Sequence, residues 1–380
     1  MADQIQEIVT RLPNLENVTG VWEVADRRLA QGDAAFLADL GIALAQRYGS
    51  GAEQMWQYRS VFDHLLRLLG TTAGPENVSQ ALRLVAATGS GRRKLDRYVA
   101  SLLAAGHQVE DLAAAFAGGG APGGVSEELR ACLVHELVLR GVAVAETPGI
   151  AEWATSPHWS HHPLGRLPLT LSDVEEHPAL PSYSVRGSSC SMPYGPSESR
   201  GMAVVPGARV PPAAETTTEA GAAAMAKAVA NWVDESNGRI EARVFALAEP
   251  VDTDSVPSTL AALGLECLNG MGRKSRISVS VCPPAQAWRV LFAAASTGGA
   301  YNSGCHGAYG RLAAWQSLAG LSGAAESASA GEVEARVRGC VWYGFDADTK
   351  WFERVAWDIG LAAVDPDRRR LAVLAATDTD

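Results

Sequence analysis

The sequence has no long apolar run. None of its 380 residues fall in an uninterrupted apolar stretch of about 18 residues, so we expect no membrane-spanning helix. The N-terminal residues MADQIQEIVTRL include early acids and lack a basic region, which argues against a signal peptide. These two absences predict a cytoplasmic protein with no membrane partner.

Basic charge is scarce as well. The formal net charge is −10, and only four of the 32 basic residues are lysine. Proteins that bind nucleic acid gain most of their affinity from lysine and arginine side chains that neutralise phosphates. The charge balance therefore predicts no nucleic-acid partner, and it leaves proteins and small molecules as candidates.

Metal-binding and redox motifs are also missing. The six cysteines include no CxxC spacing, which disfavours a zinc ribbon or a redox dithiol, and no HExxH spacing occurs. Histidines are concentrated in one segment, and if a metal is present its ligands are His158, His161, His162 and His177. Packing of these histidines against nearby tryptophans explains them more simply, so we predict neither a metal nor a cofactor.

The residues that are present suit a globular chain of more than one domain. Apolar residues make up 47% and charged residues 19%, which is ample for a buried core. Residues 1–155 show helical spacing of apolar residues, with Asp33, Pro75 and Ser126 at positions typical of helix starts. We predict an all-helical N-terminal domain, either a bundle or a short helical repeat.

Proline sets apart the next segment, residues 156–212. Ten of the nineteen prolines lie between 157 and 212. Proline fixes φ and removes a backbone donor, so long helices are excluded there. We expect an ordered covering segment as far as Tyr183 and a linker beyond it.

Residues 213–380 alternate between helical and strand patterns. Helices are predicted at 222–233, 285–295 and 312–319, and strands at 240–246, 277–282, 335–345, 354–364 and 371–377. Because the last three strands are joined by short turns, an antiparallel meander is favoured. The predicted fold class is α+β, with an all-helical N-terminal domain followed by a mixed α+β C-terminal domain whose sheet is largely antiparallel.

Two further groups of residues in this C-terminal part attract attention. The aromatic residues beside the meander are expected to pack in the core, although a flat ligand on a tryptophan-lined face is an alternative: Trp342, Tyr343, Trp351, Phe352 and Trp357. The acidic residues of the terminal run 377–380 are expected to solubilise the end of the chain.

The stretch TGGAYNSGCHGAYGR, residues 297–311, is the leading candidate for a ligand site. Its glycines would let backbone N–H groups face an anion at the start of the helix that follows. The ligand-binding residues would be Gly304, Gly307, Gly310 and Arg311, with the side chains of Tyr301, Asn302 and Tyr309. The stretch matches neither a P-loop nor GxGxxG, and a tight connection that needs positive φ is the favoured alternative.

Cys305 in this stretch is a candidate nucleophile. A thiol at a helix start is activated by the dipole and by a nearby imidazole. His306 is adjacent in the sequence, but neighbouring side chains diverge, so a distant histidine such as His162 is the better partner. A buried structural cysteine is the simpler alternative.

The C-terminal residues resemble a known protein family. GGAY…GCHGAYGRLAAWQSLAGL, followed by WFERVAWDIGLAAVDPDRRRLAVLAATDTD, is similar to an uncharacterised family of bacterial proteins from GC-rich genomes, a domain of unknown function. The resemblance lies mainly in residues 298–380. It implies a bacterial, cytoplasmic protein with a shared C-terminal module, and it carries no activity and no catalytic residues.

Three functional hypotheses follow from the sequence. The first is a protein that binds a small polar or anionic molecule in a cleft formed by 298–311 and 158–194, either as a binding protein or as an enzyme of polar group transfer or hydrolysis. The second is an adaptor or immunity-type protein that binds a protein partner through its helical domain. The third is a histidine-rich metalloprotein.

Overall fold

The computed structural model describes residues 2–49, 55–88, 93–117, 124–190, 202, 204, 208–271, 276–353 and 357–378. The chain forms two compact units. The helical unit comprises Met1–Gly165 and Pro181–Ser189, and the sheet unit comprises Arg166–Leu180 and Cys190–Asp380. The predicted covering segment 156–212 is thus shared between the units, and its residues 191–201, 203 and 205–207 lie outside the described part.

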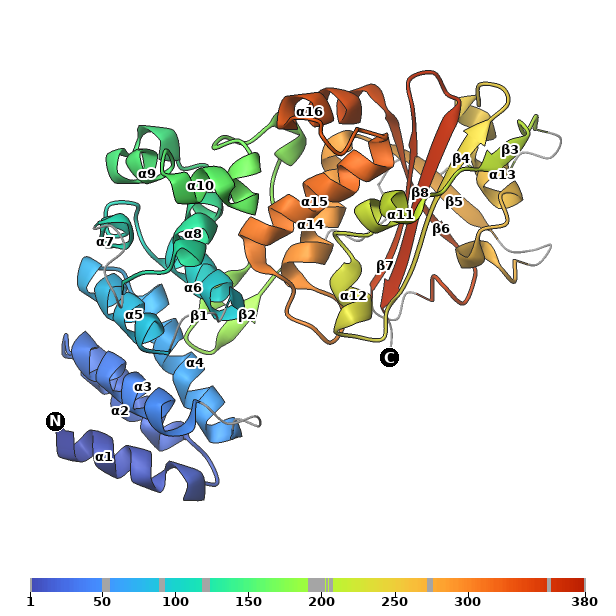
Figure 1. Ribbon diagram of the computed structural model, residues 1–380. Coiled ribbons are helices and arrows are strands. Elements are labelled where there is room, and N and C mark those ends of the chain that lie inside the picture. The colour runs from blue at the N-terminus through green and yellow to red at the C-terminus, as the bar shows by residue number, and fades with distance from the viewer. Residues whose placement is uncertain are drawn as a thin grey trace. The chain divides into compact units, whose positions relative to one another are not determined.

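The helical unit begins with closely packed helices (Figure 1). Its elements are α1 (Ala2–Arg11), α2 (Thr19–Ala30), α3 (Ala34–Tyr48), α4 (Trp56–Thr71), α5 (Pro75–Ala87), α6 (Arg93–Gly106), α7 (Ala113–Phe116), α8 (Glu127–Leu139), α9 (Pro148–Trp153), α10 (Pro157–His161) and the hairpin β1 (Ser182–Ser184) and β2 (Gly187–Ser189). The predicted helix starts are confirmed. Asp33 accepts a hydrogen bond from Phe36 N, Pro75 begins α5, and Ser126 accepts from Leu129 N.

Helix α8 is the buried centre of this unit. Every residue from Leu129 to Leu139 is buried, which is the pattern of a helix surrounded by others. Its buried polar side chains therefore need partners within the protein. Arg130 Nε donates to Ala115 O at 2.8 Å, and His135 Nε2 lies 2.8 Å from Leu164 O.

The sheet unit contains a six-stranded sheet within the described residues. Its strands are β3 (Ala213–Glu215), β4 (Arg239–Leu247), β5 (Ile277–Cys282), β6 (Val341–Ala347), β7 (Trp357–Val364) and β8 (Arg370–Asp378), in the order β3-β4-β8-β7-β6-β5. All of these pairings are antiparallel, and β6, β7 and β8 form the predicted meander. The predicted α+β class is confirmed.

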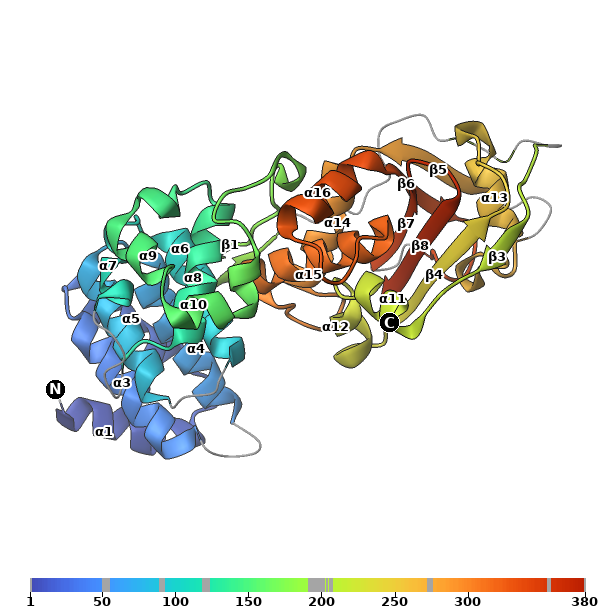
Figure 2. The same ribbon diagram turned by 45° about the horizontal axis from the view of Figure 1, so that its top comes forward.

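Helices cover both faces of this sheet (Figure 2). They are α11 (Glu219–Met225), α12 (Ala230–Asp234), α13 (Val256–Ala262), α14 (Pro284–Thr297), α15 (His306–Ser322) and α16 (Ala330–Gly339). α14 and α15 pack together on one face, whereas α13 lies on the other face over an apolar cluster that includes Phe245, Phe345 and Trp351. None of the described helices has the length and apolar character needed to cross a membrane.

Two sequence predictions in the sheet unit are wrong in part. The predicted helix 222–233 is broken into α11 and α12, because Ala228 N donates to Ser317 Oγ in α15 instead of continuing the helix. The predicted strand 335–345 is helical as far as Gly339. Ser329 and Glu332 form a capping box that starts α16, and an Arg338–Glu334 ion pair one turn apart supports its last turn.

The break between α11 and α12 should depend on the buried Ser317 hydroxyl. Replacing Ser317→Ala leaves the buried Ala228 N–H without an acceptor, so we expect a loss of about 1–3 kcal/mol in the free energy of unfolding, measured by urea denaturation. Ser296→Ala is the matched control, because the buried Ser296 hydroxyl has no hydrogen-bond partner among the described residues. Equal losses for both variants would contradict this account.

Candidate functional site

The glycine-rich stretch 297–311 forms a tight connection between α14 and α15. Gly298 and Gly304 have φ values of 86° and 62°, which other residues rarely adopt. The Asn302 side chain closes the loop, since its Oδ1 accepts from Gly299 N at 3.2 Å and from Gly304 N at 3.1 Å. The alternative of a turn that requires positive φ therefore describes the backbone of this stretch.

A carboxylate of the chain itself binds at this connection. Ala300 N donates to Asp378 Oδ2 at 2.6 Å, and Ser236 Oγ donates to Asp378 Oδ1 at 2.7 Å. A methyl group at Gly299 would lie 2.0 Å from Asp378 Oδ2, so the approach requires glycine. The Asp378 side chain is fully buried, which corrects the expectation that this residue solubilises the end of the chain. Residues 379 and 380 lie outside the described part.

Arg311 is bound to an internal carboxylate as well. Its Nε and Nη2 donate to the two carboxylate oxygens of Glu175 at 2.6 and 2.7 Å, and both side chains are buried. The remaining guanidinium donors reach the carbonyl oxygens of Pro168 and Thr170. Trp315 Nε1 also donates to Glu175. This network fastens residues 166–180 onto α15, and an anionic ligand would have to displace Glu175 to reach Arg311.

The other candidate residues of the stretch differ in exposure. Cys305 is half-buried, and its thiol donates to Ala295 O at 3.0 Å. His306 and Tyr309 are half-buried, and His306 has a φ of 62° at the first position of α15. Tyr301 is 56% exposed. Gly307 and Gly310 are buried, and Gly310 lets α15 approach Ser296 of α14.

The candidate histidines fall into both units. His162, in the helical unit, has both ring nitrogens occupied: Nε2 lies 3.2 Å from Glu128 Oε2, and Nδ1 accepts from Leu164 N. His161 Nδ1 contacts Pro157 O, and His158 is exposed, as is His177 in the sheet unit. Among the described residues, no three His, Cys, Asp or Glu side chains are gathered to hold a metal ion.

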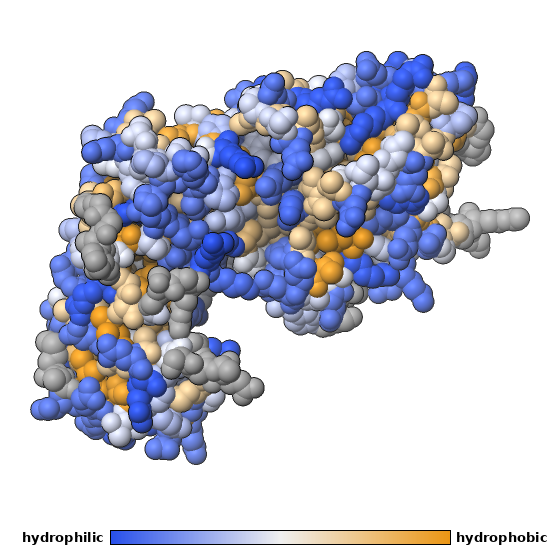
Figure 3. Space-filling model, viewed as in Figure 1, coloured by the Kyte–Doolittle hydropathy of each residue, from blue (hydrophilic) through white to orange (hydrophobic). Residues whose placement is uncertain are grey.

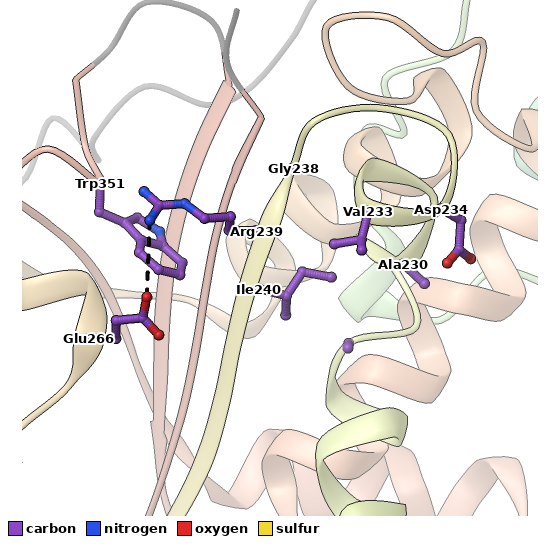
Figure 4. Close-up of a pocket in the computed structure, with 9 residues that line it drawn as sticks. Ala230, Val233, Asp234, Gly238, Arg239, Ile240, Glu266 and Trp351 are labelled. Atoms are coloured by element: carbon purple, nitrogen blue, oxygen red, sulfur yellow. Dashed lines mark ion pairs between the residues drawn. The ribbon is translucent and has the colours of Figure 1, made fainter.

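A pocket that the sequence did not predict lies beside the first residues of β4. Its volume is about 560 Å³. Its lining comes from α11–α12, the start of β4 and two further segments: Ala226, Ala230, Val233, Asp234, Gly238, Arg239, Ile240, Glu266 and Trp351. Figure 4 shows that Arg239 points to one side of β4, toward Trp351 and Glu266, while Ile240 points to the other, toward Val233 and Ala230. The pocket thus wraps around the edge of the sheet.

Backbone groups of β4 are unpaired at this pocket. Successive residues of an antiparallel strand direct their peptide groups to alternate sides. Val244 O accepts from Thr216 N on the side away from β8, so the peptide groups of Ile240 and Ala242 face the same way. Strand β3 ends before reaching them, and within the described residues these outward groups have no hydrogen-bond partner. The pocket is therefore an open strand edge between two side-chain walls.

The wall formed by α12 is held in place by the glycine-rich stretch. Asn302 Nδ2 donates to Asn231 O at 2.9 Å, and Asn231 Nδ2 donates back to Asn302 Oδ1. Ser236, in the turn before β4, is bound to Asp378. Figure 3 shows apolar residues exposed where α11 and α12 lie, and Val233 in this wall is 48% exposed. Asn302 of the predicted site thus holds the α12 wall of the pocket in place through its hydrogen bonds with Asn231.

Charged groups line the odd-numbered face of β4. Arg239 stacks over the Trp351 ring at 4.6 Å, and Arg243 over the Phe245 ring at 5.0 Å. Arg243 binds Glu215 of β3, and this hydrogen bond holds the pKa of Glu215 below its usual value. Glu241, between the two arginines, accepts from Glu266 N and Cys267 N, both at 2.8 Å.

Comparison with known proteins gives one match. The model of DUF6183, a family of unknown function, matches residues 19–380. The chain belongs to this family. For this DUF6183 member the resemblance seen in residues 298–380 is confirmed, and it extends through most of the helical unit. No curated protein and no solved structure matches the chain.

Substitutions in the buried Arg311–Glu175 ion pair test whether Arg311 has a structural role or binds a ligand. Arg311→Met would leave the Glu175 carboxylate buried without its main partner, at a cost of about 3–5 kcal/mol in urea unfolding. The double variant Arg311→Met/Glu175→Leu should recover most of that loss, because it removes both charges. Arg209→Met, at an exposed pair, is the control. An Arg311→Met variant as stable as this control would show that Arg311 is not a structural anchor.

Proposed function

We propose that this protein is an adaptor that binds an extended segment of a partner protein along the open edge of β4. The observation that carries the proposal is a pair of outward peptide groups on β4 that have no hydrogen-bond partner among the described residues: that of Ile240, which lines the pocket, and that of Ala242, the next outward position along the strand. Unpaired strand edges are templates for another strand. Addition of a strand would satisfy these groups with the same hydrogen bonds that β3 makes further along β4.

The two walls suit the alternating side chains of an added strand. Side chains of a strand point alternately to opposite faces of the sheet. One set would therefore meet Arg239 and Trp351, and the next set would meet Ile240 and Val233. In this mode of recognition the backbone supplies affinity and the flanking side chains supply specificity.

This proposal moves the binding site away from both sites expected from the sequence. The guanidinium of Arg311, which was expected to bind an anion, is bound to Glu175, and the amide of Ala300 in the same glycine-rich stretch is bound to Asp378. The partner groove expected on the helical domain stays a prediction. The adaptor role is retained, and the edge of β4 is its proposed location.

A small ligand in the same pocket is the second candidate function. The pocket has room for a small molecule, at about 560 Å³, but it is widely open to solvent, so such a ligand would be only partly enclosed. Arg239, stacked on Trp351, would bind an anionic or polar group of such a ligand. The two candidates differ in whether the outward peptide groups of β4 become hydrogen-bonded when the site is filled.

Hydrogen exchange combined with peptide selection tests the adaptor proposal. In the free protein the amides of Ile240 and Ala242 should exchange much faster than those of Glu241 and Arg243, which pair with β8. Heptapeptides selected from a random display library should protect Ile240 and Ala242. Failure to select any peptide that protects these amides would contradict the proposal.

Ala242→Pro tests the same edge by substitution. Proline removes the outward N–H of residue 242, and its ring hinders the approach of an added strand. It breaks no hydrogen bond to β8. We expect binding of the selected peptides to fall at least about tenfold with little change in Tm. Ala242→Ser keeps the N–H and is the matched control. A small ligand that binds Ala242→Pro as well as the parent protein would favour the second candidate instead.

A further inference from the structure

The guanidinium of Arg239 is preorganised beside the open edge. It stacks over Trp351 at 4.6 Å, and the Trp351 side chain is buried and so holds the arginine in position. Arg239 lies 4.0 Å from Glu266, and both side chains are more than half exposed. Within the described residues the guanidinium makes no hydrogen bond. Its planar donors are therefore available to a carboxylate that approaches along the strand.

The same strand shows how an added segment meets such an arginine. Arg243 lies on the same face of β4, four residues further on, and stacks over Phe245 as Arg239 stacks over Trp351. Glu215 of strand β3 lies opposite Phe245 and reaches Arg243 diagonally, where the two side chains form an ion pair. Arg239 has the same stacking on an aromatic ring at the part of the edge where β3 is absent, so an acid on an added strand would come within reach of it in the same way.

We propose that the segment recognised at the β4 edge is acidic, with an aspartate or glutamate side chain that faces Arg239. This inference rests on the proposed adaptor function and names the chemistry of the partner. In an antiparallel pair, directly opposite residues have Cβ atoms about 5 Å apart, so a carboxylate opposite Arg239 reaches its guanidinium. Arg239 is then the residue that determines specificity.

The side chains that line the pocket indicate which residues the segment would carry at its neighbouring positions. The residue opposite Ile240 would point toward Val233 and Ala230, where an apolar side chain packs. The residue opposite Glu241 would face a buried carboxylate that already accepts two backbone hydrogen bonds, which favours a small polar residue there. The segment that fits best therefore alternates small polar or apolar residues with an acid at the Arg239 position.

A series of matched peptides tests the inference. The probes are fluorescein-labelled Thr-Ala-Thr-Val-Glu-Thr-amide and its two variants with Gln or Lys in place of Glu, titrated with the full chain by fluorescence anisotropy. Hydrogen exchange at Ile240 reports whether each peptide occupies the edge. We expect the Glu peptide to bind about three- to tenfold more tightly than the Gln peptide, and the Lys peptide to bind weakest. Added salt should narrow these differences.

Charge reversal at Arg239 is the second part of this experiment. Arg239→Glu should favour the Lys peptide over the Glu peptide, and Arg239→Gln should make the Glu and Gln peptides bind alike. Arg209→Glu makes the same charge change at an exposed ion pair outside the pocket lining and should leave the order of the peptides unchanged. An unchanged Tm for each variant confirms that the fold is intact.

The outcomes separate this inference from the function on which it rests. Protection of Ile240 by all three peptides with equal affinity would overturn the acidic preference and leave the adaptor proposal standing. If neither these probes nor the peptides selected from the library protect Ile240, the adaptor proposal itself falls. Protection of Ile240 that rises with protein concentration and without peptide, together with a dimer in sedimentation velocity, would overturn both in favour of a second copy of the chain.

Discussion

The buried carboxylate of Asp378 is the interaction on which the candidate site depends. It lies at the end of β8, and it joins three segments that are far apart in the sequence: β8, the connection at Ala300 and the turn at Ser236. A buried carboxylate must be hydrogen-bonded to be tolerated. The position of Ser236 is thereby set, and with it the direction in which β4 leaves α12. The buried carboxylate of Asp378 thus helps to fix the position of the α12 wall of the pocket.

Glu175 plays a comparable part elsewhere in the sheet unit. Its carboxylate accepts from Arg311, Trp315 and Ser172 N, so a short segment without regular strands is fixed on α15. Glu175 occupies the place beside Arg311 where the sequence suggested an external anion, and Asp378 binds elsewhere in the same glycine-rich stretch. Glycine-built helix starts and buried arginines attract negative charge whatever its source. A sequence alone does not reveal whether that charge arrives with a ligand or from a distant part of the chain.

Local signals explain which parts of the fold were predictable. The caps at Asp33 and Ser126 and the strand 277–282 depend on residues close in sequence, and they were predicted correctly. The break between α11 and α12 depends on Ser317, nearly ninety residues later, so no local pattern indicated it. The alternation of apolar and polar residues in β4 was evident in the sequence. Its open edge was not, because it depends on where β3 stops pairing with β4. Trp351 was correctly expected in the core, and its stacking with Arg239 was not foreseeable.

An open strand edge exposes a β-sheet to aggregation with other chains. Charged side chains on β4 oppose such association. Proteins commonly protect exposed edges with charged side chains, which disfavour pairing with arbitrary strands. On β4, Arg243 is already paired with Glu215 of β3, whereas Arg239 has only a 4.0 Å contact with Glu266 and is more than half exposed, so a neutral strand would have to displace water from it. Glu215 shows that an acidic strand meets no such penalty, because it pairs with Arg243 directly. Under the proposed function, the arginine that disfavours pairing with arbitrary strands at this edge would also select an acidic segment. Protection and specificity would then arise from the same guanidinium group, that of Arg239.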